Sequence, residues 1–406
     1  VKGAKIGVTR FGATSHVMAQ AVVKALGIEG KEVKFISMGG GAPHVAGLRA
    51  GAIDMGVNWT PDPALVEAFH ATTRQDPERH RIITSLGGTA KLELYAGLLR
   101  VRLQDVTLKR WVKTGVISKA WLGTGEEATT VGPVHALDRS TDIVAPMIRN
   151  AGACSEMGMP IADGFRTYLA TADGPSGGRD LHAGSLAYRV LQPVSHVGDM
   201  IPVVAGVALA ARMRREPTVA LTWVGDGSTA AGTAHEGFNF AAVQRVPVIF
   251  IVQNNQVALG TRVDQHHLPG ALERLPESYG MAGGLFDGNN VLDAYAATRL
   301  AAERCRAGEG PVMLIAETFR MGGHATHDER EARETFPAEW FEHWGQRDPV
   351  GLYEEYLKLE GMSAETLADV EAQVEAEVLA AEQEALVSRE GKIPEGASAT
   401  RGVYGE

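Results

Sequence analysis

The spacing of apolar and polar positions predicts an α/β protein. Near the start of the chain, short apolar runs at residues 5–9, 33–37 and 53–58 predict strands. Between them, residues 15–26 and 43–50 have the apolar spacing of helices. This order of strand, helix, strand, helix and strand is typical of a parallel sheet, so residues 1–70 are expected to form a small α/β unit.

Further along, the pattern predicts a linker and then a larger α/β domain. Residues 71–90 are polar and basic and lack a periodic apolar face, so they are expected to link the two parts. The domain is expected to span residues 91–389, with nearly all-apolar runs at 219–224 and 248–252 as buried strands. Residues 340–389 are expected to be helical, and 390–406 to be a flexible tail.

The last helix, residues 363–386, has the clearest apolar stripe. Its apolar residues recur at helical spacing, and glutamates occupy the other face. The stripe comprises Leu367, Val370, Val374, Val378, Ala381 and Ala385.

Composition and charge exclude several classes of protein. With 45% hydrophobic and 22% charged residues, the chain is expected to be ordered. Its longest clean apolar stretch, residues 202–211, is about half of the ~20 residues that a membrane span needs. Of the net charge of −10, the excess of acid lies in residues 325–406, with 20 acidic and 7 basic side chains. We interpret this region as a solvated helical surface. The sequence contains no cluster of basic residues with interleaved aromatics, so nucleic-acid binding is not favoured.

Cysteine usage and the first residues suggest a compartment. Two cysteines, Cys154 and Cys305, cannot form a disulfide framework, which favours a reducing environment. The first residues show no charged segment followed by an apolar core, so no signal peptide is expected. The expected location is therefore the cytoplasm.

Polar residues follow both apolar runs at the places where parallel strands end. The first run ends in Gly225-Asp226-Gly227, and the second ends in Asn254-Asn255. The 26 residues between them, 228–253, have the length of one crossover helix. We therefore expect Asp226 and Asn255 at the carboxyl ends of neighbouring strands, where open α/β sheets bind ligands.

The chemistry of these residues points to a metal-bound phosphate ligand. Carboxylate and carboxamide oxygens suit Mg²⁺ or Ca²⁺ and are poor ligands for zinc. A magnesium ion with so few protein oxygens is usually completed by ligand phosphates, and glycines let the backbone approach such a group. The alternative is two ordinary turns, which the combination of both motifs at crossover spacing disfavours.

These motifs resemble those of proteins that bind thiamine diphosphate. Residues 92–356 resemble the alpha subunit of heterotetrameric 2-oxo acid dehydrogenases of the pyruvate, branched-chain and acetoin type. Besides the two motifs above, the segments that carry the resemblance are 123–128 (GTGEEA), 142–144 (DIV), 148–152 (IRNAG), 182–202, 319–324 (FRMGGH) and Asp348-Pro349.

The resemblance implies a set of cofactor ligands. Mg²⁺ would be bound by Asp226, the side chain of Asn255 and the carbonyl of Val257. Arg149 and Arg320 would pair with the diphosphate, because a planar guanidinium meets two phosphate oxygens at once.

Further residues follow from the same resemblance. The Gly225 and Gly227 backbones would flank the diphosphate, and the backbones of Ser195 and Val197 would contact the aminopyrimidine ring. His324 would lie near the reacting atoms, and His182 is a weaker candidate for a second catalytic histidine.

The resemblance also implies a reaction and partners. Thiamine diphosphate would support oxidative decarboxylation of a 2-oxo acid and transfer of the acyl group to a lipoyl group. In such enzymes a glutamate of a beta subunit contacts the pyrimidine, and no second pyrimidine-type domain is recognisable here. An α2β2 heterotetramer docked onto a lipoylated acyltransferase is therefore expected.

Three departures from the family pattern keep an alternative open. The family tyrosine before the first arginine is Ile148, a family glutamine is Met200, and the phosphorylatable serine after the loop histidine is Ala325. A non-catalytic homologue therefore stays possible. His266 and His267 have no matching metal ligands, so an ordinary polar loop is favoured there.

Residues 1–70 do not resemble this family. They resemble the first lobe of solute-binding receptors of the nitrate, sulfonate and taurine transporters. The segments that carry this likeness are 2–8, the glycines at 39–41, and 48–54 (LRAGAID). The second lobe is missing, so we favour a docking or effector-binding stub without the transport role. A vestige of such a receptor and an artefact of the gene assignment are the alternatives. A solute- or anion-binding module is the second hypothesis for the chain.

Overall fold

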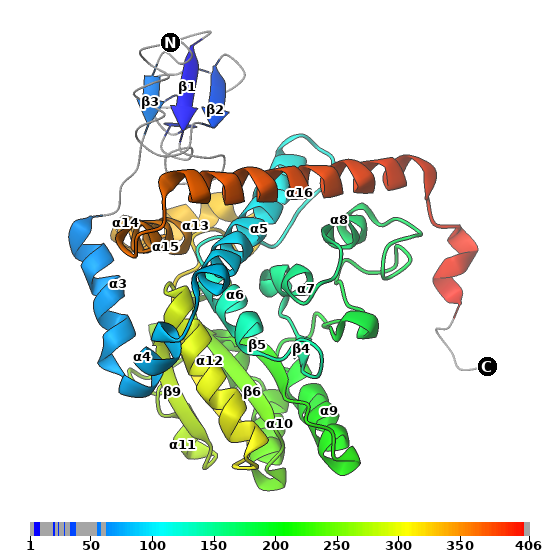
Figure 1. The fold of residues 1–406 in the computed structure, drawn as a ribbon. Coiled ribbons are helices and arrows are strands. Elements are labelled where there is room, and N and C mark those ends of the chain that lie inside the picture. The colour runs from blue at the N-terminus through cyan, green and yellow to red at the C-terminus, as the bar shows by residue number, and fades with distance from the viewer. Residues whose placement is uncertain are drawn as a thin grey trace.

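The N-terminal part of the computed structural model contains a small parallel sheet (Figure 1). Its three strands have the order β2-β1-β3, with β1 at Lys5–Val8, β2 at Lys34–Ser37 and β3 at Met55–Val57. They confirm the predicted strands. The structure describes residues 4–8, 19–20, 23, 28, 33–37, 55–57 and 62–401. The predicted loop at 39–41, the helix at 43–50 and most of the helix at 15–26 lie outside these residues.

The larger part is built on a five-stranded sheet in the order β4-β5-β6-β10-β9, and every pairing is parallel. The strands are β4 (Ile143–Ala145), β5 (Ala220–Gly225), β6 (Val248–Asn254), β9 (Ala282–Asp287) and β10 (Val312–Glu317). All residues of β6 are buried, as its continuous apolar run predicts for a strand covered on both faces. The predicted fold class, a parallel sheet flanked by helices, is confirmed.

Helices cover both faces of this sheet. On one face, α9 (Met200–Arg214) and α10 (Gly232–Gln244) pack on alternate residues of the strands, and the Phe238 ring meets Phe250 edge-on at 5.0 Å. On the other face lies α12 (Val291–Arg306), against which α6 (Glu127–Ala136) packs. A Cβ at Gly132 of α6 would lie 2.7 Å from the Val291 carbonyl oxygen, so the close helix contact requires glycine there.

The segment predicted as a linker, residues 71–90, is largely helical. This segment belongs to three helices, α3 (Pro63–Gln75), α4 (Pro77–Thr84) and α5 (Gly88–Lys113). The side chains of Asp62 and Asp76 cap the first two helices, each followed by a proline at the first helical position. Tertiary contacts compensate for the weak apolar pattern of α4. Ile82 and Ile83 are buried, and Arg79 pairs with Asp293 of α12 at 2.9 Å.

The C-terminal region is helical, as predicted. It contains α13 (Glu329–Thr335), α14 (Ala338–Gly345), α15 (Pro349–Leu359) and α16 (Ala364–Gly391). In Figure 1, α16 crosses the top of the molecule, and it packs against α5 and α8 (Ile161–Leu169). The expected tail is ordered in part: the Lys392 carbonyl accepts a hydrogen bond from the Ala172 amide at 2.8 Å, and η6 spans Gly396–Thr400.

Short elements complete the described part of the chain. They are the helices α7 (Gly152–Glu156) and α11 (Leu275–Ser278), the antiparallel pair β7 (Val257–Ala258) and β8 (Thr261–Arg262), and the single turns η2 (Ile148–Asn150), η3 (Leu186–Tyr188), η4 (Asp226–Ala230) and η5 (Val263–Gln265).

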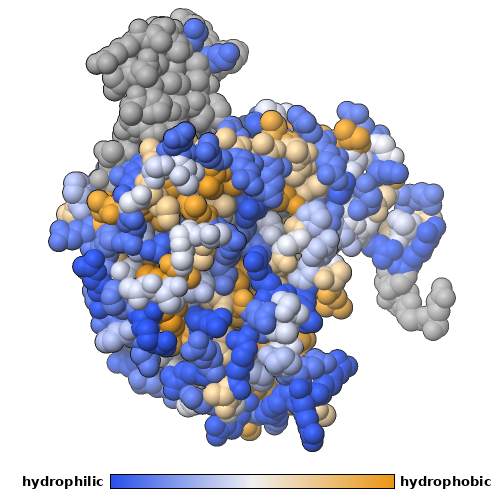
Figure 2. All heavy atoms as spheres, in the orientation of Figure 1, coloured by the Kyte–Doolittle hydropathy of each residue, from blue (hydrophilic) through white to orange (hydrophobic). Residues whose placement is uncertain are grey.

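The surface mixes polar and apolar side chains. On the face drawn in Figure 2, polar residues cover most of the lower half, and apolar residues are more frequent in the upper half. Among the described residues, none of the helices combines the length and the apolar character that crossing a membrane requires.

The buried carboxylate of Glu382 binds α16 to α5, and we expect the loss of this carboxylate to destabilise the fold. Glu382 is 7% exposed, accepts a hydrogen bond from the Trp111 indole at 2.7 Å and pairs with Arg110. Glu382→Ala leaves the buried indole N–H without its acceptor, so the free energy of unfolding should fall by about 2 kcal/mol. Glu377→Ala removes an exposed partner of Arg100 on the same helix and should cost at most about 0.5 kcal/mol. Urea denaturation of both variants measures the difference, and equal losses would contradict this role of Glu382.

Candidate functional site

The carboxyl ends of four adjacent strands bring the predicted site residues together. Arg149 follows β4, Asp226 follows β5, Asn255 follows β6 and Arg320 follows β10. These strands are neighbours in the sheet order, so their ends lie side by side. Backbone hydrogen bonds tie the loops as well, since the Arg320 amide donates to the Asn255 carbonyl at 3.3 Å. The expectation that Asp226 and Asn255 share one edge of the sheet is confirmed.

Several buried side-chain oxygens at this edge have no hydrogen-bond donor among the described residues, including those of Gln253 and Asn254. Asp226 Oδ2 and Asn255 Oδ1 are both unpartnered, although Asp226 is 1% exposed. The other oxygen of Asp226 accepts from the Gly227 amide at 2.7 Å. Burial raises the pKa of Asp226 to about 6. Unpartnered buried oxygens are costly, and a cation bound between them would satisfy both.

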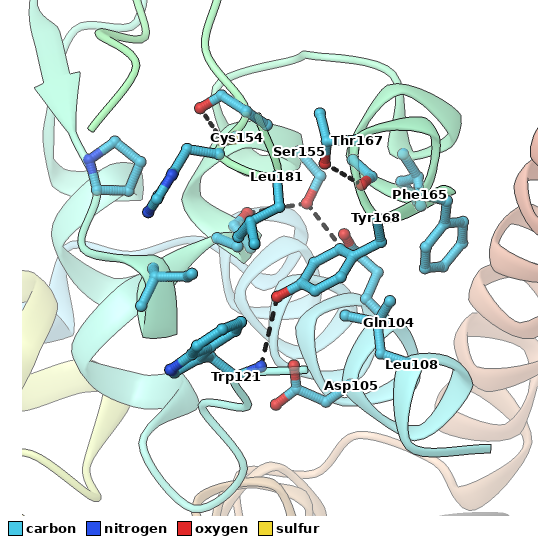
Figure 3. A pocket seen from close by; sticks show the side chains of 18 of the residues that line it. Gln104, Asp105, Leu108, Trp121, Cys154, Ser155, Phe165, Thr167, Tyr168 and Leu181 are labelled. Atoms are coloured by element: carbon cyan, nitrogen blue, oxygen red, sulfur yellow. Dashed lines mark hydrogen bonds between the residues drawn. The ribbon is translucent and has the colours of Figure 1, made fainter. Parts of the chain in front are cut away.

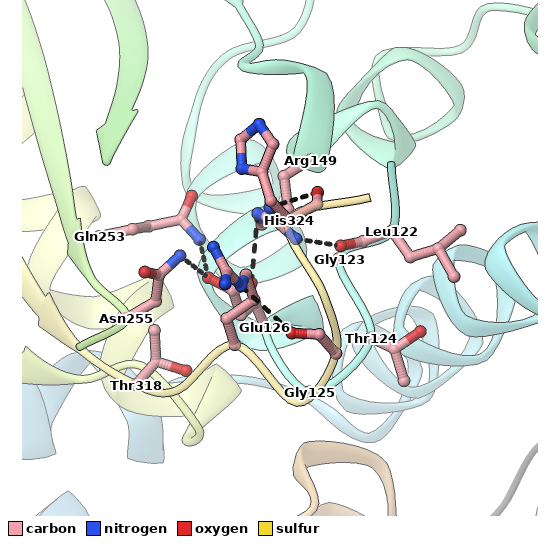
Figure 4. Close-up of polar contacts among 12 residues, drawn as sticks. Leu122, Gly123, Thr124, Gly125, Glu126, Arg149, Gln253, Asn255, Thr318 and His324 are labelled. Carbon is pink, nitrogen blue, oxygen red and sulfur yellow. Dashed lines mark hydrogen bonds and ion pairs between the residues drawn. The ribbon is translucent and has the colours of Figure 1, made fainter. Parts of the chain in front are cut away.

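Glu126 connects the two sides of the site (Figure 4). Its Oε1 accepts hydrogen bonds from the Asn255 and Gln253 side chains at 3.0 and 2.9 Å, and its Oε2 lies 3.6 Å from Arg149 Nε. Because Glu126 holds the amide nitrogen of Asn255, the carbonyl oxygen of that side chain stays available. Sequence reasoning placed Glu126 inside the GTGEEA segment but gave it no role.

The two predicted diphosphate ligands are buried and interact electrostatically. Arg149 donates to the Leu122 carbonyl at 2.5 Å and to the His324 carbonyl at 3.1 Å. Arg320 donates to the Leu259 carbonyl at 2.6 Å and is 2% exposed. Burial and the nearby charge of Arg149 lower the pKa of Arg320 to about 10. Two guanidinium groups held in a buried edge favour binding of an anion, which would relieve their repulsion.

His324 lies in the same electrostatic environment. It is attached to the site through its backbone, since its carbonyl accepts from Arg149 and its amide donates to Asp328 at 3.0 Å. Burial, together with the charges of Arg149 and Arg320, lowers the pKa of His324 to about 4. The ring is therefore neutral at pH 7, a form in which it can accept a hydrogen bond or a proton.

Two glycines allow the close approaches that the site needs. A Cβ on Gly227 would lie 2.4 Å from the Cβ of Ala258 in β7, so the turn after β5 fits beneath β7 only with glycine. A Cβ on Gly123 would lie 2.4 Å from the carbonyl oxygen of Arg149. Gly225 has no such crowding, because the nearest atom is 3.8 Å away.

Buried ionisable groups hold the loop that carries Glu126. Asp105 of α5 accepts hydrogen bonds from the Gly123 amide at 2.8 Å and the Thr124 hydroxyl at 3.0 Å. Arg102 of the same helix pairs with Glu127 and with Asp348. The Asp348-Pro349 dipeptide therefore acts through this network, because Asp348 fixes Arg102 and also caps α15.

A cavity lies next to the site, between α5, α7 and α8 (Figure 3). Ile148, the neighbour of Arg149, lines it, and so does His182. Most of the other walls are apolar, and they include Val101, Leu108, Trp121, Phe165 and Leu181; Gln104, Asp105 and Tyr168 add polar groups. We refer to it as the α5–α8 cavity. The structure thus places His182 on the cavity wall, and the ring of His182 forms a hydrogen bond with Asp180 and not with Glu126 or its partners.

The remaining predicted residues occupy nearby loops. Ser195 and Val197 are exposed on the segment before α9, and Val197 is 65% exposed. Val257 begins β7 and is buried. His267, which had no role in the sequence analysis, lies 3.2 Å from the Asp226 carbonyl oxygen and 3.0 Å from the Thr229 hydroxyl. In the part of the chain that the structure describes, no three histidines, cysteines or carboxylates cluster as a metal site. The predicted set of Asp226, Asn255 and a backbone carbonyl is not such a cluster, because it contains one carboxylate, one carboxamide and one main-chain oxygen.

The site therefore combines unpartnered oxygens for a cation with buried guanidinium groups for an anion, which suits a metal-bound phosphate ligand. A comparison with protein-family models matches residues 98–393 to the dehydrogenase E1 component. The chain belongs to this family.

The relatives in this family that resemble the chain are alpha subunits. The chain is 32% identical over 292 residues to the 2-oxoisovalerate dehydrogenase subunit alpha of Bacillus subtilis, covering 71% of this chain and 88% of that protein. It is 31% identical over 278 residues to the 3-methyl-2-oxobutanoate dehydrogenase subunit alpha of Mycobacterium tuberculosis, which covers 68% of this chain and 72% of that protein. A pyruvate dehydrogenase E1 component subunit alpha of Staphylococcus epidermidis is 30% identical to the chain, and the match covers 69% of this chain and 74% of that protein. The chain is thus an alpha-type component of a 2-oxo acid dehydrogenase.

The family match does not include residues 1–70. The resemblance of this segment to solute-binding proteins therefore stays a prediction, as does the division of the chain into domains.

The pair of arginines should make the chain bind inorganic diphosphate in the presence of Mg²⁺. Arg320→Met removes one buried guanidinium, so affinity should fall by about tenfold or more. Arg330→Met is the matched control, because Arg330 is 89% exposed and pairs only within α13. Isothermal titration calorimetry at pH 7.5 measures both. Equal affinities for the two variants would contradict an anion site at Arg320.

Asp105 should make stability depend on pH. Burial raises its pKa to about 7, above the 3.8 of an ordinary aspartate, so the folded state holds an extra proton between these values. Its contribution to stability is complete below pH 3.8 and is lost as pH rises through about 7. Asp105→Asn keeps an acceptor for Gly123 and cannot ionise. The melting temperature of this variant relative to wild type should therefore increase from pH 5 to pH 8, and a constant difference would contradict the assignment.

Proposed function

We propose that the chain is the alpha subunit of a thiamine-diphosphate- and Mg²⁺-dependent 2-oxo acid dehydrogenase. The observation that carries the proposal is the joint placement of two unpartnered buried oxygens and two buried guanidinium groups at one sheet edge. The residues fit the group: Asp226, Asn255 and the Val257 carbonyl would hold Mg²⁺, and Arg149 and Arg320 would hold the diphosphate. When bound, the cofactor supplies the carbon nucleophile and electron sink for decarboxylation.

The chain's own residues would bind the cofactor, orient it and exclude water from the site. Glu126 orients Asn255 toward the metal and lies beside Arg149, so one carboxylate sets the direction of both kinds of ligand. The Gly227 backbone can approach the diphosphate, and Ser195 and Val197 would contact the pyrimidine from their exposed segment. Because the ring of His324 is neutral, it can accept a hydrogen bond or a proton from a donor group that lies near the diphosphate.

We further propose that catalysis requires a beta subunit in an α2β2 assembly. Apolar side chains are exposed along α9 and α10, namely Val203, Met213, Phe240 and Val243, between 40% and 75% exposed. Such exposure on two packed helices is typical of a surface that a partner covers. Acyl transfer to a lipoylated acyltransferase would follow, as the alpha-subunit family implies.

The substrate is proposed only as a 2-oxo acid. The relatives are named for 2-oxoisovalerate, 3-methyl-2-oxobutanoate and pyruvate, so their names span side chains from methyl to branched. A cytoplasmic location is part of the same proposal.

Oxidation of 2-oxo acids by the chain co-expressed with a beta-type subunit tests the proposal. The assay contains thiamine diphosphate, Mg²⁺ and an artificial electron acceptor, with pyruvate, 2-oxobutyrate or 3-methyl-2-oxobutanoate as substrate. Asp226→Ala should lower turnover by about 10³-fold or more, because it removes the carboxylate ligand of the metal that positions the cofactor.

Asp264→Ala is the control, since Asp264 is half-exposed and pairs with Arg262 two positions before it. Its turnover should equal that of wild type. If wild type binds the cofactor without turnover on any 2-oxo acid, the chain is a non-catalytic homologue. If it binds neither cofactor nor Mg²⁺, the proposal is wrong.

A further inference from the structure

We infer that Asp180, together with Gln192, is a positioning residue that fixes the ring of His182 with Nε2 facing the α5–α8 cavity as a proton acceptor. The inference rests on the proposed function, because the cavity adjoins the proposed cofactor site. It concerns two residues to which neither the family match nor the sequence motifs assign a role.

The evidence begins with the contacts of His182. The ring Nδ1 lies 2.8 Å from Asp180 Oδ1, and the His182 side chain is 5% exposed. The second oxygen of Asp180 accepts a hydrogen bond from Gln192 Nε2 at 3.1 Å. Both oxygens of the Asp180 carboxylate therefore accept a hydrogen bond, one from His182 and one from Gln192.

These contacts determine which ring nitrogen carries the proton. An ionised carboxylate can only accept hydrogen bonds, so His182 Nδ1 must donate. The hydrogen bond with His182 also holds the pKa of Asp180 below its usual range, although burial acts in the opposite direction. In the neutral ring, Nε2 then carries the lone pair, as in histidines oriented by a carboxylate.

The geometry directs that lone pair into the cavity. His182 lines the α5–α8 cavity and Asp180 does not, so the inferred orientation turns Nε2, the ring nitrogen away from Asp180, toward the cavity. A proton donor in the cavity can therefore reach His182 only from the side opposite Asp180. This is the arrangement that general acid–base catalysis requires.

The loop that carries Asp180 is held from two directions. Within the loop, the Ser176 hydroxyl donates to the Asp180 carbonyl at 2.6 Å, and the Asp180 amide donates back at 3.2 Å. At its start, the Ala172 amide donates to the Lys392 carbonyl just beyond α16. A rigid loop keeps the carboxylate in place when the ring changes charge, which is what a positioning residue must do.

The two candidate histidines therefore have different roles. His324 lies beside two guanidinium groups that disfavour its protonated form. The ring of His182 instead lies 2.8 Å from the carboxylate of Asp180. When Nε2 takes a proton from a donor in the cavity, the bond between that donor and its proton breaks and the Nε2–H bond forms, while Nδ1–H stays hydrogen-bonded to Asp180. Return of the proton restores the neutral ring, and no oxidant or reductant takes part.

Other titratable groups face the same cavity and enter any pH profile. They are Asp105 on α5, Cys154 on α7 and Tyr168 on α8. Burial raises the pKa of Asp105 to about 7, that of Cys154 to about 12, and that of Tyr168 above its usual value. Because the pKa of Asp105 is raised to about 7, the variant of this residue must be measured in parallel.

The first test does not depend on activity. Two-dimensional ¹⁵N–¹H spectra of the full chain, labelled at histidine, distinguish the two neutral tautomers, and His182→Gln assigns the signal. We expect the Nδ1–H tautomer in wild type and a mixture of tautomers in Asp180→Ala, which removes the acceptor oxygen. A wild-type ring protonated on Nε2, or an unchanged tautomer in Asp180→Ala, would overturn the inference.

The second test uses the complex with a beta-type subunit. Asp180→Asn should lower kcat by about 10- to 100-fold with KM within about twofold, and should move the acid limb of the pH–kcat profile to lower pH. The acid limb is expected to move because the ring of His182 loses the negative charge of Asp180 beside it. Asp105→Asn separates the contribution of that group to the same profile.

Asp173→Asn is the matched control, because it removes an exposed carboxylate from the same loop, one that does not line the cavity. It should leave kcat and the acid limb unchanged. If Asp180→Asn behaves like Asp173→Asn while wild type is active, the inference fails and the proposed function stands. If wild type is inactive on every 2-oxo acid, the proposed function fails, and the tautomer spectra still decide the role of Asp180.

Discussion

The buried carboxylate of Glu126 is the interaction on which the candidate site depends. It accepts hydrogen bonds from the side chains of Gln253 and Asn255, and it lies beside the guanidinium of Arg149. A buried carboxylate is stable only when it is paired and hydrogen-bonded, so these partners are held in fixed directions. In turn, α5 holds the Glu126 loop through Asp105 and Arg102. Removal of Arg149 would take away the counter-charge of Glu126, and removal of Gln253 or Asn255 would take away one of the hydrogen bonds that its Oε1 accepts.

The same constraint explains why the site is arranged for an ion-pair ligand. Burial raises the pKa of Asp226 and lowers that of Arg320, so both charged forms carry a desolvation cost without a ligand. A cation next to Asp226 and an anion next to Arg320 would each offset that cost. The parallel sheet makes this possible, because neighbouring strand ends supply groups of opposite charge within one edge. The shape of the sheet and the electrostatics of the site therefore support the same kind of ligand.

Much of this could be predicted from local sequence. The nearly apolar runs that became β5 and β6, the crossover length between their ends and the stripe on α16 follow from periodicity, which reflects burial directly. Residues 71–90 were predicted as a linker because α4 has a weak apolar pattern. Its stability comes from caps at Asp76 and from the pairing of Arg79 with Asp293, a partner 214 positions away. Contacts at such separations leave no periodic signal in the chain.

The sequence by itself determined the element types, the parallel sheet and the presence of Asp226 and Asn255 at strand ends, because these depend on spacing and residue type. Only the tertiary structure decided which groups meet. It placed Glu126 between the two kinds of ligand, buried Glu382 of the glutamate-rich α16 against Trp111, and set His182 beside Asp180 on the cavity wall. The reason is physical: periodicity reports the solvent exposure of a position, whereas hydrogen bonds depend on distances between segments that folding alone brings together.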